Sequence, residues 1–158
     1  MLRRFAPRND TILYEFETIV AQRRISSILK YYMTDKKVIL FIDDNPVDRT
    51  LIGRILAKHD FEVLLAEDGA IGLRMSQERK PDLILMDILL PHISGIELCK
   101  KIKQNPVTKD IPVIFYTSIG TPKNLIDYTS YGAVDYFQKT TPPEELIASI
   151  KAVLKQGV

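Results

Sequence analysis

Five short apolar runs punctuate the chain from residue 37 onward, and their starts lie roughly 20 to 30 residues apart. The runs cover residues 38–42, 62–66, 82–86, 113–116 and 134–137. This spacing leaves room for a helix between each pair of runs, which is typical of alternating strand–helix units and a parallel sheet. The pattern therefore predicts an α/β fold with five parallel strands.

Start signals for helices follow several of these runs. A polar capping residue followed by proline, or by an acid three positions later, favours the beginning of a helix. Such signals occur at Asn45-Pro46, Ser94-Gly95-Ile96-Glu97, Thr121-Pro122 and Thr141-Pro142-Pro143-Glu144. Each of these segments is predicted to open a helix.

Polarity within the runs indicates which strands are central. The first, third and fourth runs are almost wholly apolar, as expected for strands buried on both faces. The second and fifth contain Glu62 and Asp135, which suit edge strands. We expect a doubly wound, flavodoxin-like sheet in the order 2-1-3-4-5 with helices on both faces, although periodicity alone leaves other orders open.

Residues 1–36 differ from the remainder in charge and pattern. Residues 1–37 contain eight basic and four acidic residues, whereas residues 38–158 have 14 basic and 16 acidic residues. Residues 11–33 lack Gly and Pro and are predicted to be helical, with apolar positions on two opposite faces. We expect a basic helical extension at 1–36 and the sheet domain at 37–158. The extension would serve in homodimerisation or partner docking, as a linker, or as a helix attracted to acidic lipid or nucleic acid.

Composition excludes several classes of protein. No apolar run is long enough to span a bilayer, and the N-terminus lacks the apolar stretch of a secretory signal. A single cysteine excludes an internal disulfide framework, so a cytoplasmic location is expected. The GxxxxGK[ST] phosphate-binding loop and the GxGxxG dinucleotide motif are both absent.

Polar residues that could carry chemistry follow four of the five predicted strands. They are Asp43, Asp44, Asp87, Thr117 and Lys139. In an open parallel sheet, ligands bind beyond the carboxyl ends of the strands. With the first and third strands adjacent, the three aspartates are expected to meet in one cleft, and Thr117 and Lys139 to approach it from the other side.

Three neighbouring carboxylates need a cation, and their oxygen-only character suits Mg²⁺. Thr117 and Lys139 are not needed to hold a metal, but a hydroxyl and an ammonium group are suited to the oxygens of a phosphoryl group. A carboxylate can itself be the nucleophile that receives this group. Asp87 is the natural candidate because it stands alone at the centre of the predicted sheet.

These residues occur in segments that resemble the receiver domain of two-component response regulators, over residues 38–155. The segments are FIDDNPVDR, PDLILMDILLPHISGIELCKKIK, IPVIFYTS and YGAVDYFQK. Asp87, Pro91 and Gly95 fall at the family's spacing, and Tyr136 falls at its aromatic switch position. The order and combination of the segments make the resemblance specific.

The resemblance implies that a histidine kinase or histidine phosphotransfer protein donates a phosphoryl group to Asp87. It implies that Asp44, Asp87 and the backbone carbonyl of Leu89 bind Mg²⁺ directly and that Asp43 acts largely through water. Thr117 and Lys139 would contact phosphate oxygens.

The resemblance also implies a conformational switch. The phosphoryl group would draw Thr117 inward and let Tyr136 rotate into the vacated space. This would repack the face formed by the helix after Thr121, the strand at 134–137 and the helix after Thr141. That face, or residues 11–33, would support a homodimer. An unidentified downstream protein would read the switch, with no clear nucleic-acid binding and no separate catalytic domain.

Two positions depart from the family pattern. Thr140 follows the lysine where the family usually has proline, and Leu89 is apolar where a side chain can influence phosphate hydrolysis. Two alternatives follow: a receiver-like binding module that no longer takes phosphate, and an aspartyl-phosphate phosphatase-type enzyme. The second would require an acid two residues after the nucleophile, where Leu89 stands.

Overall fold

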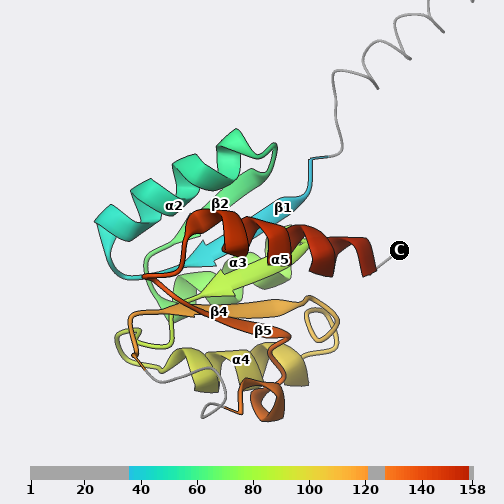
Figure 1. Cartoon of the computed structure of the whole chain (residues 1–158). Helices are drawn as coiled ribbons and strands as arrows, with labels where there is room; N and C mark the ends of the chain where they lie inside the picture. The colour runs from blue at the N-terminus through green and yellow to red at the C-terminus, as the bar shows by residue number, and fades with distance from the viewer. Residues whose placement is uncertain (1–35, 121–126, 157–158) are drawn as a thin grey trace, which may run out of the picture. The chain divides into compact units, whose positions relative to one another are not determined.

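The computed structural model describes residues 36–120 and 127–156, and Figure 1 shows their arrangement. Five parallel strands form one sheet in the order β2-β1-β3-β4-β5, as predicted. The strands are β1 Val38–Ile42, β2 Glu62–Ala66, β3 Leu83–Met86, β4 Val113–Thr117 and β5 Asp135–Gln138. The expected strand limits are correct to within one residue, and the two strands with acidic residues lie at the edges.

A helix follows each strand. They are α2 Pro46–Lys58, α3 Gly69–Arg79, α4 Gly95–Gln104, α5 Pro143–Gln156 and the 3₁₀ helix η2 Tyr128–Tyr131. The Asn45 side chain accepts hydrogen bonds from the backbone N–H groups of Val47 and Asp48, which caps α2 as expected. Ser94 likewise caps α4 by accepting from the Glu97 N–H at 3.2 Å.

One predicted helix start is displaced and another is untested. The α5 helix begins at Pro143, two residues after Thr141, so the proline that opens it is the second of the pair. The Thr121-Pro122 start and the helix expected at residues 11–33 lie outside the described residues. The division of the chain into residues 1–36 and 37–158 stays a prediction.

The sheet separates two hydrophobic clusters, which lie under the helices on its two faces; Figure 1 shows these helices. Phe41 and Leu85 point to the face covered by α2 and α5, where Ile52, Leu56 and Ile150 are buried. The opposite face carries α3 and α4; its cluster comprises Leu40, Ile42, Ala66, Ile84, Met86, Ile88, Leu98, Cys99, Ile102, Val113, Phe115, Ala133 and Tyr136. Because side chains alternate along a strand, a residue that follows a strand also points to one or the other of these two faces.

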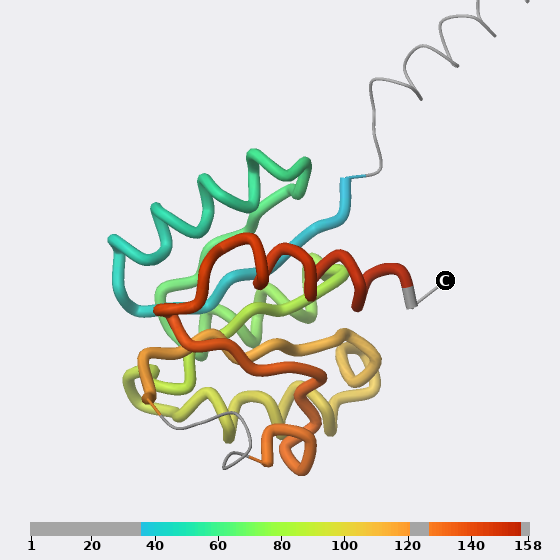
Figure 2. The backbone as a smooth tube through the Cα atoms, viewed as in Figure 1, coloured from blue at the N-terminus to red at the C-terminus, as the bar shows by residue number. Residues whose placement is uncertain are grey.

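The carboxyl ends of the strands gather at one edge of the sheet, and Figure 2 follows the chain from that edge into α2 and α5. Asp43 follows Phe41 by two residues, Asp87 follows Leu85 by two, and Lys139 follows Phe137 by two. All three therefore continue on the α2–α5 face of the sheet. No helix among the described residues is long and apolar enough to cross a membrane.

Candidate functional site

Three aspartates lie together at the carboxyl edge of the sheet. One carboxylate oxygen from each of Asp43, Asp44 and Asp87 lies within 4.8 Å of the others. Asp43 is 0% and Asp87 3% exposed, whereas Asp44 is exposed. The parallel pairing of β1 with β3 brings these residues together as the sequence predicted.

Backbone hydrogen bonds fix the orientation of the two buried carboxylates. Asp43 Oδ1 accepts from the Asn45 N–H at 2.9 Å, and Asp87 Oδ1 accepts from the Leu89 N–H at 3.0 Å. In both residues, the other oxygen, Oδ2, is the one that faces Lys139. The loops after β1 and β3 thus hold the acids so that their second oxygens converge.

Lys139 brings one ammonium group to this convergence. Its Nζ lies 2.7 Å from Asp43 Oδ2 and 2.8 Å from Asp87 Oδ2, and its side chain is 15% exposed. Its backbone N–H donates to the Thr117 carbonyl at 2.9 Å, which ties the end of β5 to the end of β4. None of the described peptide bonds is cis, so Thr140 follows Lys139 through a trans bond.

Burial and charge shift the pKa values of this pair. Burial raises the pKa of the Asp43 carboxyl above its ordinary value, although the Lys139 ammonium and the Asn45 N–H oppose this effect. Burial alone would lower the pKa of Lys139, but its contacts with Asp43, Asp87 and Asp48, an acid of α2, outweigh this and raise it. Lys139 is therefore positively charged at neutral pH.

The acid cluster fits a hard divalent cation. Asp43 Oδ2 is buried, and the Lys139 ammonium contacts it at 2.7 Å. The atoms that could bind a metal here are carboxylate oxygens, which are the ligands that Mg²⁺ prefers. Three carboxylates lie beside one ammonium group, and a divalent cation would balance their remaining charge.

Thr117 and Tyr136 lie on the other face of the sheet from Lys139. Thr117 is buried at the end of β4, and its hydroxyl oxygen is 3.4 Å from the Ile119 N–H. Tyr136 is buried among the α3–α4 cluster and its hydroxyl donates to the Ile119 carbonyl at 2.8 Å. The Tyr136 side chain is thus buried in this structure. Its expected rotation on phosphorylation stays a prediction.

Gly95, the first residue of α4, allows this helix to start close to the segment that carries Asp87. Its N–H donates to the Ile88 carbonyl at 2.8 Å, which brings the start of α4 against the segment that carries Asp87. A Cβ atom at this position would collide with the Asp87 carbonyl oxygen. Leu89, two residues after Asp87, is exposed beside the acids.

Sequence reasoning missed two residues of α2 that contact the site. Asp48 Oδ2 accepts a hydrogen bond from Lys139 Nζ at 2.8 Å, and Arg49 Nη1 donates to the Asp43 carbonyl at 2.7 Å. Their positions in the first turn of a helix that starts directly after the acid pair were the available signal. The predicted site residues were those directly after each strand, and the first turn of the following helix was not considered.

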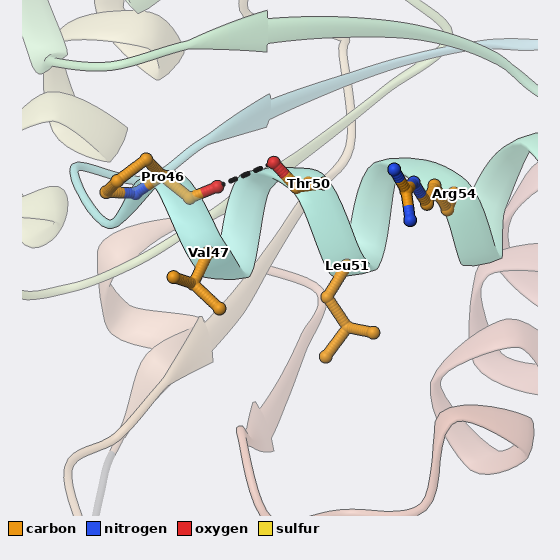
Figure 3. A pocket seen from close by; sticks show the side chains of 5 residues that line it. All are labelled: Pro46, Val47, Thr50, Leu51 and Arg54. Atoms are coloured by element: carbon orange, nitrogen blue, oxygen red, sulfur yellow. Dashed lines mark hydrogen bonds between the residues drawn. The ribbon is translucent and has the colours of Figure 1, made fainter.

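An open hollow of about 450 Å³ lies on α2 itself (Figure 3). Pro46, Val47, Thr50, Leu51 and Arg54 line it. The Thr50 hydroxyl donates to the Pro46 carbonyl, while Val47 and Leu51 are exposed. No carboxylate lines the hollow, so the chemistry belongs to the neighbouring acid cluster.

Comparison with known families and proteins gives a consistent result. The response regulator receiver domain family matches residues 39–151. The chain is 42% identical over 120 residues to the phosphate regulon transcriptional regulatory protein PhoB of Pseudomonas aeruginosa, covering 76% of this chain and 52% of PhoB. It is 34% identical over 116 residues to Protein PilH of the same organism, covering 73% of this chain and 96% of PilH. The chain thus spans about half the length of PhoB.

Solved structures have the same fold. A putative response regulator from Chloroflexus aurantiacus has a TM-score of 0.72 at 31% identity, covering 77% of this chain and 99% of that protein. The receiver domain of a sensor histidine kinase from Pseudomonas aeruginosa has a TM-score of 0.69 at 27% identity, with coverage of 76% and 98%. That structure has a magnesium ion coordinated in its active site cleft.

Proposed function

Because the chain belongs to the response regulator receiver domain family, we propose that it is a phosphorylation-activated switch of a two-component phosphorelay. Receiver domains of this family are phosphorylated by histidine kinases and bind Mg²⁺ at an acidic pocket. In this chain the phosphoryl group is accepted by Asp87. The observation that carries the proposal is the convergence of Asp87, two further aspartates and Lys139 at one edge of the sheet.

Asp87 acts as the nucleophile. Its Oδ2 oxygen attacks the phosphorus of a donor phosphohistidine, a P–O bond to Asp87 forms, and the P–N bond breaks. The donor imidazole leaves with the electron pair of that bond and takes up a proton. The contact of Asp87 Oδ1 with the Leu89 N–H holds the carboxylate so that Oδ2 is the attacking atom.

Lys139 and Thr117 act on the incoming oxygens. The Lys139 ammonium is 2.8 Å from Asp87 Oδ2, so it is placed to neutralise charge on the transferred group. The Thr117 hydroxyl lies at the end of the neighbouring strand β4. Bound Mg²⁺ would neutralise phosphoryl charge, held by Asp44, Asp87 and the Leu89 carbonyl, with Asp43 acting through water.

The switch involves Thr117 and Tyr136. A phosphoryl group adds about −1.5 to −2 charges at neutral pH, which attracts the Thr117 hydroxyl towards Asp87. Tyr136 is bonded through its hydroxyl to the Ile119 carbonyl, so movement of the segment after β4 is coupled to the ring. Phosphorylation would then favour one packing of the β4–β5 side of the domain.

One partner protein would phosphorylate this domain, and another would bind its phosphorylated form. A donor that brings its phosphohistidine to Asp87 would cover the edge where α2 begins, and Val47 and Leu51 offer exposed apolar contacts there. The downstream protein is unidentified. A homodimer through residues 11–33, or through the face that includes β5 and α5, remains part of the proposal.

Intact mass after incubation with acetyl phosphate tests this function. With Mg²⁺ present, the protein is expected to gain about 80 Da, the mass of one HPO₃ unit, and the gain should disappear when Mg²⁺ is chelated. The absence of any gain with Mg²⁺ would favour the alternative of a receiver-like module that only binds partners. A phosphatase-type activity is disfavoured, because Leu89 cannot act as an acid or base.

A further inference from the structure

Asp48 is the third carboxylate in contact with Lys139, and it comes from a helix. Its Oδ2 lies 2.8 Å from Lys139 Nζ and accepts a hydrogen bond from it. The Asp48 side chain is 27% exposed, whereas the other two carboxylate partners of Lys139 are buried. The ammonium is therefore shared between a buried acid pair and an acid at the rim.

The two sets of partners differ in what else they can bind. Asp43 and Asp87 belong to the group of carboxylates that lie within 4.8 Å of one another and could hold a metal ion. Asp48 is not a member of that group. A cation that binds the cluster competes with the Lys139 ammonium for Asp43 and Asp87 but leaves Asp48 to the lysine.

We propose that Asp48 is a positioning residue that keeps the Lys139 ammonium at the rim of the site when Mg²⁺ engages Asp87 directly and Asp43 through water. The inference rests on the proposed function. Asp48 then has two effects, and both increase the affinity for Mg²⁺. It adds one negative charge near the site, and it provides the displaced ammonium with a partner, so that releasing the buried acids costs less.

The location of Asp48 supports this role. It lies in the first turn of α2, whose cap, Asn45, follows the acid pair directly. The backbone of that turn is fixed by two hydrogen bonds to Asn45, and the neighbouring Arg49 donates to the Asp43 carbonyl at 2.7 Å. The start of α2 is thus joined both to the acid pair and, through Asp48, to the residue after β5.

A double-mutant cycle on Mg²⁺ affinity tests the inference without any phosphoryl donor. The affinity is measured by titrating the folded protein with MgCl₂ and following backbone amide shifts, which also report whether each variant is folded. Asp48→Asn should weaken Mg²⁺ binding about fivefold. One negative charge near the site is lost, and the Lys139 ammonium, without Asp48 as a partner, competes more strongly with Mg²⁺ for the buried acids. Lys139→Met should strengthen it.

In the Lys139→Met background, adding Asp48→Asn should change the affinity by less than about twofold, because only screened charge remains. Glu67→Gln is the matched control. Glu67 follows β2 at the same edge, is 67% exposed and contacts Arg49 at 3.8 Å without touching Lys139. It removes one negative charge from this edge and should weaken binding by less than about twofold in either background.

Two results would overturn the inference while the proposed function stands. One is an Asp48→Asn affinity equal to that of Glu67→Gln. The other is an undiminished Asp48→Asn effect in the Lys139→Met background, which would make Asp48 a direct ligand or a simple charge. If the wild-type protein did not bind Mg²⁺ at all, both the inference and the proposed metal site would be wrong.

Discussion

A Gly95→Ala variant should unfold more easily than the wild type by about 3 kcal/mol, the upper part of the usual range for overpacking. The added Cβ would collide with the Asp87 carbonyl oxygen, and it would lie 2.9 Å from Ile88 Cα and 3.0 Å from the Asp87 carbonyl carbon. All three are backbone atoms, so no side-chain rotation can relieve the clash. Urea denaturation followed by circular dichroism measures the change.

Gly53→Ala is the control for this prediction. Gly53 lies within α2, and its added Cβ would meet the Leu65 side chain at 3.6 and 3.7 Å, which is ordinary contact. Alanine favours a helix interior over glycine by about 0.5–1 kcal/mol, so this variant should be at least as stable as the wild type. Equal destabilisation of both variants would refute the proposed close approach of α4 to the Asp87 segment.

Lys139→Met should slow phosphorylation by acetyl phosphate about 100-fold at saturating Mg²⁺, as the loss of one charge-stabilising group typically does. The same substitution should raise Mg²⁺ affinity about tenfold, because the ammonium no longer occupies Asp43 and Asp87. Opposite effects on metal binding and on rate distinguish a group that acts on the phosphoryl oxygens from one that only supports folding.

The rate is measured from the increase of the phosphorylated mass with time, and Lys37→Met is the matched control. Lys37 pairs with Asp82 at 2.9 Å, at the opposite end of the sheet from the acid cluster. Its replacement should change neither rate nor affinity. A Lys139→Met protein that is phosphorylated at the wild-type rate would contradict the assigned role of the lysine.

The sheet could be predicted from the sequence because its determinants are local. Each strand is a short apolar run, and the acids Glu62 and Asp135 identified the edges. Once the order was set, the meeting of Asp43, Asp44 and Asp87 followed from parallel pairing alone. Lys139 joined them for the same reason, as the residue directly after β5.

The contact between Asp48 and Lys139 could not be predicted in this way. It links residues 91 positions apart and depends on how the first turn of α2 packs beside the end of β5. Side-chain alternation places Lys139 on the α2–α5 face, but the reach of a helical aspartate to it is a matter of tertiary geometry. The start of α5 was misplaced by one residue because Pro142 and Pro143 are both acceptable helix openers.

The central claim is that Asp87 itself receives the phosphoryl group, and intact mass tests it most directly. Wild type, Asp87→Asn and Asp82→Asn are incubated with acetyl phosphate and Mg²⁺ under identical conditions. Asp82 lies directly before β3, at the end opposite Asp87, where it accepts from the Val38 N–H at 2.8 Å. Wild type and Asp82→Asn should gain about 80 Da, and Asp87→Asn should gain nothing. A gain of that size in folded Asp87→Asn would contradict the account, because another residue would then be the acceptor.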